Sequence, residues 1–150
     1  MPSHRVLRPS GWAGPRGYAD GVVISTGRLV VLAGQVGWNP VTQRVETDNL
    51  AGQVRQALAN IVTLLTDAGV EPQHLVRLTW YIIDREAYVA ARPEIGRAYR
   101  EVIGDHYPPM SVVFVTALVE ERAKVEIEAM AVVDDAESAR GPDSGFRESS

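Results

Sequence analysis

The closing stretch of the sequence's main apolar region, HYPPMSVVFVTALVEERAKVEIEAMAVV from His106 to Val133, contains two apolar runs joined by a charged turn. In the second run polar and apolar residues alternate, so Glu126 and Glu128 share one side, as in a β-strand with two unlike faces. The first run, Val112 to Val115, is apolar on both sides. These runs predict the last two strands of a sheet, one of which carries two carboxylates on a single face.

Three elements nearer the N-terminus are predicted by their patterns. The apolar runs Gly21–Ser25 and Arg28–Gly34 are separated by Thr26 and Gly27, which predicts a hairpin with a two-residue turn. From residue 49 to residue 68 apolar residues recur at helical spacing, and the glycine that follows is suited to ending a helix because it tolerates a positive φ. This segment predicts the first helix.

The middle of the chain predicts one more strand and a second helix. In HLVRLTWYII, from His74 to Ile83, apolar and polar side chains alternate as in a half-buried strand. Asp84 is placed to cap a helix that Gly104 ends, and Pro93 is expected to break or restart it. The resulting order ββαβαββ predicts an α+β fold in which two helices cover one face of a mixed sheet.

Two helices leave the other face of that sheet without a cover. Residues 22–24, 30–32 and 112–115 are nevertheless apolar on both sides of the pleat. An apolar face of this kind marks an interface, and the sequence shows no further domain to bury it. The simplest partner is a second copy of the same chain, so the sequence predicts a homo-oligomer whose sites lie between subunits.

Composition limits the remaining possibilities. The 150 residues carry a formal net charge of −4 and include no cysteine, which disfavours nucleic-acid binding and excludes thiol chemistry and disulfides. No run is apolar enough for a membrane span or a signal peptide, so a cytoplasmic protein without membrane partners is predicted. Residues 1–133 form one predicted domain, and the polar residues 134–150 form a tail that should be dispensable for folding.

The sequence resembles the RidA/YjgF family of imine and enamine deaminases. Three segments carry the resemblance, in this order: ADGVVISTGRLVVLAGQVGWNP, VRLTWYIID and YPPMSVVFVTALVEERAKVEIEAMAVV. The likeness runs from about residue 18 to residue 133, and its best signatures are the Gly34-Gln35 pair and the closing VEIEAMAV. It implies a chorismate-mutase-like α+β fold assembled as a homotrimer, with small-molecule clefts between subunits and with neither a metal nor an organic cofactor.

The resemblance also assigns residues to the cleft. It implies that Glu126 carries the catalytic proton, although the strand pattern taken alone is more typical of a solvated face. The expected substrate-binding residues lie on the N-terminal loop, after the second strand and at the start of the penultimate strand. They are Tyr18, Gly34, Trp38, Met110, Ser111 and Val112.

Met110 is where this sequence departs from the family. Deaminating members carry an arginine there that forks onto a substrate carboxylate, whereas a thioether donates no hydrogen bond. A methionine would instead make the pocket more apolar. Candidates for a substitute cation, which are otherwise typical surface residues, are Arg16, Arg85, Arg92 and Arg97.

Two classes of function remain open. The first is a cofactor-free hydrolase of reactive imines or enamines, like a 2-iminobutanoate/2-iminopropanoate deaminase, whose substrate is altered or lacks a carboxylate because Met110 replaces the arginine. The second is a non-catalytic trimer that binds a small molecule or another protein in the same clefts. Ribonuclease activity, known for some relatives, is disfavoured by the net charge of −4.

Overall fold

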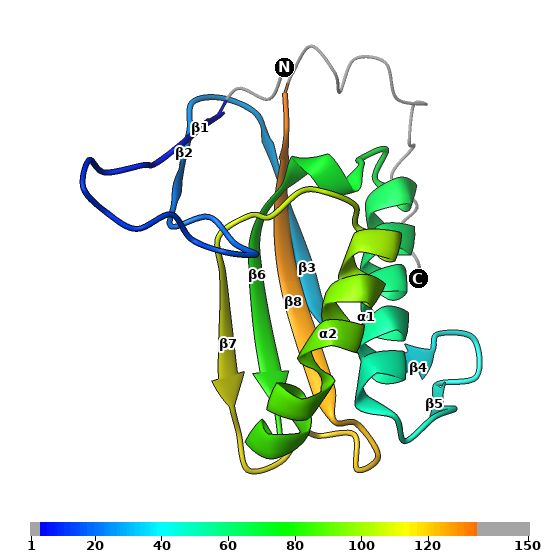
Figure 1. Ribbon diagram of the computed structural model, residues 1–150. Helices are drawn as coiled ribbons and strands as arrows, with labels where there is room; N and C mark the ends of the chain where they lie inside the picture. The colour runs from blue at the N-terminus through cyan, green and yellow to red at the C-terminus, as the bar shows by residue number, and fades with distance from the viewer. Residues whose placement is uncertain (1–3, 135–150) are drawn as a thin grey trace.

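The computed structural model describes residues 4–134, which fold around a four-stranded mixed sheet (Figure 1). The strands lie in the order β3-β8-β6-β7, so β3 and β7 form the two edges. β6 pairs antiparallel with β8 and parallel with β7. The strand bounds are β3 Arg28–Val36, β6 Leu75–Ile82, β7 Met110–Phe114 and β8 Val125–Val133.

Two long helices, α1 (Leu50–Asp67) and α2 (Arg85–Val102), pack side by side on one face of this sheet (Figure 1). Each begins at a side-chain cap, because Asn49 accepts a hydrogen bond from the Gly52 N–H at 2.8 Å and Asp84 accepts one from the Ala87 N–H at 3.0 Å. The predicted helices and the predicted α+β architecture are therefore confirmed.

The alternation of β8 sorts its side chains between the two faces of the sheet. Val125 and Ile127 are fully buried beneath the helices, whereas Glu126 and Glu128 are half-buried on the opposite face. On that opposite face Leu29 and Val31 of β3 are 62% and 61% exposed, and Val113 and Met130 are 40% exposed. The predicted second apolar face therefore exists, and one copy of the chain leaves it uncovered.

The predicted hairpin between residues 21–25 and 28–34 is wrong. The strand β2 (Val22–Ile24) instead pairs antiparallel with β1 (His4–Val6) in a separate two-stranded sheet, while β3 pairs with β8. The reason lies at Gly27, whose φ of +138° turns the chain away from the sheet. A side chain there would meet the carbonyl oxygen of Val133 at 2.7 Å, so this close passage requires glycine.

Pro93 does not break the second helix, contrary to the prediction. α2 continues through it without interruption. Proline removes one helical hydrogen bond, to the carbonyl of residue 89, and both Pro93 and Val89 are exposed, so water can satisfy that carbonyl. The chain also forms three short elements that the pattern did not indicate: β4 (Trp38–Asn39), β5 (Arg44–Val45) and the 3₁₀ turn η1 (Pro72–His74).

A buried glutamine fixes the start of β8 against the start of α1. Gln53 is fully buried, and its amide donates to the carbonyl oxygens of Thr47 at 2.9 Å and Arg122 at 3.1 Å. Its own carbonyl accepts the backbone N–H of Lys124 at 2.7 Å. These bonds hold the segment that leads into β8, and therefore Glu126, two residues further on, in a set position.

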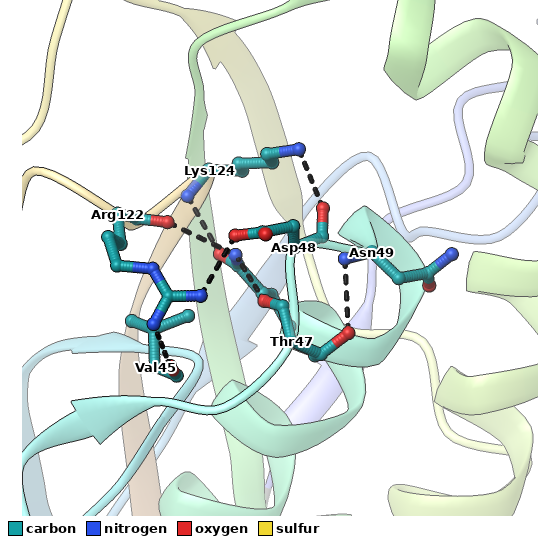
Figure 2. Close-up of polar contacts among 7 residues, drawn as sticks. Val45, Thr47, Asp48, Asn49, Arg122 and Lys124 are labelled. Atoms are coloured by element: carbon teal, nitrogen blue, oxygen red, sulfur yellow. Dashed lines mark hydrogen bonds and ion pairs between the residues drawn. The ribbon is translucent and has the colours of Figure 1, made fainter.

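Charged side chains reinforce the same junction, as Figure 2 shows. The guanidinium of Arg122 donates to the carbonyl of Val45 at 2.6 Å and to the carboxylate of Asp48 at 3.0 Å. The Lys124 ammonium donates to the backbone carbonyl of Asp48 at 2.6 Å. The turn before β8 is thereby bonded to the segment before α1 over more than 70 residues of sequence.

Candidate active site

Glu126 lies on the uncovered face with its carboxyl group against Gly34. β3 has an irregularity between Leu32 and Gln35, and a Cβ added to Gly34 would lie 2.8 Å from both Cδ and Oε2 of Glu126. A side chain at residue 34 would displace the carboxyl group from this place. The structure therefore brings together two of the predicted site residues from opposite ends of the sequence.

The neighbouring carboxylate, Glu128, is engaged by a tyrosine. The hydroxyl of Tyr81 donates to Oε1 of Glu128 at 2.5 Å, and this hydrogen bond raises the pKa of Tyr81. Glu126 forms no side-chain hydrogen bond or ion pair with any of residues 4–134. Of the two carboxylates on this face, Glu126 is the one that is available to a ligand.

Ser111 lies on the same uncovered face. Its hydroxyl accepts a hydrogen bond from Nη2 of Arg77 at 3.0 Å. Arg77 and Tyr81 both lie on β6 and were not assigned to the site from the sequence. The signal was present, because polar residues at alternate positions of β6 face the same way as Glu126 and Glu128.

Three of the other predicted residues line a pocket of about 800 Å³ on the helix-covered side of the sheet. This pocket lies between α2, the edge strand β7 and residues 16–18 of the N-terminal loop. It is lined by Arg16, Gly17, Tyr18, Trp80, Tyr88, Arg92, Ile95, Gly96, Tyr99, Arg100, Tyr107, Met110, Val112 and Phe114. Tyr18, Met110 and Val112 thus line the pocket, whereas Ser111 faces away from it because strand residues alternate.

Stacked rings form one wall of the pocket. The Tyr99 ring lies between Trp80 and Tyr107, with centroid distances of 6.3 Å and 5.3 Å. The Tyr99 hydroxyl donates to the carbonyl of His106 at 2.6 Å, and burial raises the pKa of this tyrosine far above its usual range. Tyr99 is therefore uncharged at physiological pH.

Trp38 belongs to neither group of residues. It lies in β4, just beyond the end of β3, and its backbone carbonyl accepts a hydrogen bond from Nδ2 of the buried Asn60 at 3.0 Å. It does not line the 800 Å³ pocket.

The sequence reasoning missed most of the pocket. Tyr88, Gly96 and Arg100 line it from α2, and their spacing of four or eight residues places them on one side of the helix. Tyr99 and Tyr107 line it as well.

Within residues 4–134 no group of three or more acidic or histidine side chains is arranged to hold a metal ion, and none of the helices has the length and apolar character of a membrane span.

The chain is similar to proteins of one family over most of its length. The family model described as endoribonuclease L-PSP matches residues 13–133. A RutC family protein of Haemophilus influenzae is 33% identical over 109 residues, which cover 73% of this chain and 82% of the relative. The 2-iminobutanoate/2-iminopropanoate deaminase of Escherichia coli is 30% identical over 118 residues, covering 77% of this chain and 86% of the relative.

A solved structure supports the same relationship. The Rid family protein YyfB from Yersinia pestis, whose function is unknown, superposes with a TM-score of 0.77 at 30% identity, covering 87% of this chain and 99% of that one. The fold, the family model and the relatives agree, so this chain belongs to the RidA/YjgF family.

Proposed function

We propose that this protein is a cofactor-free hydrolase of reactive imines or enamines, with Glu126 as the proton carrier. The observation that carries the proposal is the carboxyl group of Glu126, which lies against Gly34 on the uncovered face and has no other partner among the described residues. The relationship to a 2-iminobutanoate/2-iminopropanoate deaminase supports the type of reaction.

The reaction needs one group that moves protons. As water adds to the carbon of the C=N bond, the Glu126 carboxylate accepts a proton from that water and passes it to the nitrogen. Glu126 next takes the remaining proton from the hydroxyl group of this adduct and delivers it to the nitrogen. The C–N bond breaks as the C=O bond forms, and the products are a carbonyl compound and ammonia. Backbone groups near Gly34 and Val112 orient the substrate.

The two groups of site residues favour a cleft between subunits. Glu126, Gly34 and Ser111 lie on the uncovered face, whereas the pocket with Tyr18 and Met110 lies on the other side of the same sheet, next to the edge strand β7. A single chain cannot present both groups to one small substrate. A second copy that places its pocket edge against this uncovered face completes the site.

The first expected result concerns assembly. Burial of Leu29, Val31, Val113 and Met130 should drive formation of a stable homotrimer. Sedimentation equilibrium at micromolar protein concentration measures the mass directly. A monomer would remove both the cover for this face and the shared cleft.

The second expected result concerns Met110, which lines the pocket. The unmodified protein should hydrolyse 2-iminopropanoate, generated in place by an amino-acid lyase, little faster than the spontaneous reaction. Met110→Arg should raise that rate by about ten- to a hundredfold, since a charge-assisted fork to a carboxylate contributes roughly 1.5–3 kcal/mol. Met110→Gln, which is polar but uncharged, is the matched control and should give no comparable gain. Turnover by the unmodified protein equal to that of arginine-bearing relatives would contradict this expectation.

The runner-up is a non-catalytic trimer that binds a small molecule or a protein in the same cleft. Met110 favours it, because the family's anchor for the substrate carboxylate is absent at that position. It is distinguished by tight ligand binding without turnover of any imine by either the unmodified protein or Met110→Arg.

A further inference from the structure

We infer that the pocket between α2 and β7 binds a carboxylate that carries an aromatic ring, with the ring inside the pocket and the carboxylate at a group of arginines that takes the place of the arginine absent at position 110. This inference rests on the proposed function only for the imine group of the substrate, which would be an imino acid with an aromatic side chain. Binding of the aromatic anion itself does not depend on hydrolysis.

Aromatic side chains are concentrated in this pocket. The whole chain has ten of them, and six line the pocket: Tyr18, Trp80, Tyr88, Tyr99, Tyr107 and Phe114. Five of them form two groups, the Trp80–Tyr99–Tyr107 stack and an edge-to-face pair of Tyr88 and Phe114 with centroids 5.7 Å apart. Flat rings at this density favour a flat apolar ligand.

Three guanidinium groups and no carboxylate line the same pocket. These are Arg16, Arg92 and Arg100, in a chain whose net charge is −4. None of the three forms an ion pair with a carboxylate of residues 4–134. Arg92 lies over the ring of Tyr88, 5.7 Å from its centroid, so the charge is held beside an aromatic wall. Such a place favours an anion that also carries a ring.

A buried donor without an acceptor also lines the pocket. Trp80 is only 3% exposed, and its indole N–H has no hydrogen-bond partner among the described residues. Leaving such a donor unpaired is costly, so a buried group of this kind calls for a partner. Because this nitrogen has almost no exposed surface, a polar atom of a ligand reaches it only if neighbouring side chains move.

Gly96 and Met110 provide room for a ring. A Cβ added at Gly96 would meet no atom within 4 Å except Nη1 of Arg100 at 3.4 Å, so the helix leaves space beneath that guanidinium. Met110 adds an apolar, polarisable surface at the edge strand. Arg77, by contrast, donates to Ser111 on the far side of the sheet and does not line this pocket.

The test is equilibrium binding to the full-length protein by isothermal titration calorimetry, with three probes. 3-Phenylpropanoate carries a ring and a carboxylate, propanoate lacks the ring, and 3-phenylpropan-1-ol lacks the charge. We expect 3-phenylpropanoate to bind at least about tenfold more tightly than either of the others, since both features contribute. Raising the salt concentration should weaken binding of the anion and leave the alcohol unchanged.

Substitutions on α2 separate the charge from the cavity. Arg92→Gln combined with Arg100→Gln should weaken 3-phenylpropanoate binding about tenfold or more and spare the alcohol. Arg97→Gln is the matched control, because Arg97 is an exposed arginine of the same helix that does not line the pocket. Gly96→Leu should abolish binding of both ring compounds, because the leucine side chain fills the space. Its melting temperature should not fall, because leucine favours a helix more than glycine does.

Either of two results overturns the inference: propanoate binding as tightly as 3-phenylpropanoate, or Arg97→Gln weakening binding as much as the double substitution. The proposed hydrolysis fails independently. Selective binding without turnover of any imine refutes the hydrolase and leaves the ligand class standing. Turnover of small aliphatic imines without selective binding does the reverse.

Discussion

Replacing Glu126 with glutamine should lower the rate of imine hydrolysis by about 10²- to 10⁴-fold, because the amide cannot carry the proton. The substitution keeps the shape of the side chain beside Gly34, so the melting temperature should change little. The effect is measured as ammonia release above the spontaneous rate from an aromatic imino acid, the substrate class inferred above, generated in place by an amino-acid oxidase.

Glu128→Gln provides the matched control on the same face of β8. Its carboxylate is engaged by the Tyr81 hydroxyl, so its loss should reduce turnover by no more than about tenfold. Equal losses from the two substitutions would show that this face needs negative charge rather than one proton carrier.

If the cleft is shared between subunits, a second variant should restore activity to the Glu126→Gln protein. Gly96→Leu blocks the pocket half of the site and leaves Glu126 intact. Co-expressed with Glu126→Gln, it should form mixed assemblies in which about a quarter of the clefts combine two unaltered halves, so activity reappears from two inactive parents. No recovery in verified mixed assemblies would place both halves of the site in one subunit.

Replacing Gln53 with leucine should lower the free energy of unfolding by about 3–5 kcal/mol, because three partly buried backbone groups lose their partner. These are the carbonyls of Thr47 and Arg122 and the N–H of Lys124. Urea unfolding at one fixed protein concentration measures the loss. Thr63→Val, at a solvent-exposed hydroxyl of the same helix, should cost much less.

Gln53→Glu tests the same site by its pH dependence. The new carboxyl group would be buried and would face two carbonyl oxygens, so its pKa in the folded protein should lie above that in the unfolded chain. The folded state then binds the extra proton. The free energy of unfolding of the variant is therefore furthest below that of the unmodified protein at pH values above the folded-state pKa. The difference should become smaller as the pH falls through that pKa. A deficit that does not vary with pH would contradict this account.

Periodicity was sufficient to predict the elements that bury one regular face. The stripe of α1 and the alternation of β6 and β8 depend only on neighbouring residues, so the helices, the strands and the unlike faces of β8 followed from local spacing. The uncovered apolar face could be predicted because two helices cover only one face of a sheet whose strands are apolar on both sides. The resemblance named the family.

What the pattern did not predict depends on contacts between distant segments. The partner of β2 is decided at Gly27, where the chain passes the end of β8, and no local signal distinguishes a turn into the sheet from a turn away from it. The pocket joins rings from the N-terminal loop, α2 and the segment before β7. Its members are ordinary core or surface residues when each is taken in its own segment. The roles assigned to Glu126 and the substrate-binding residues stay predictions.

The alternation along β7 has a consequence for how this protein can diverge. Met110 and Val112 line the aromatic pocket, while Ser111 between them faces the carboxylates on the other side. Neighbouring positions of β7 therefore contribute side chains to two different places, the pocket on one side of the sheet and the uncovered face on the other. Mutations at 110 and 112 can retune which molecule is recognised without disturbing the chemistry behind the strand, whereas a one-residue deletion in β7 would exchange the two sets at once.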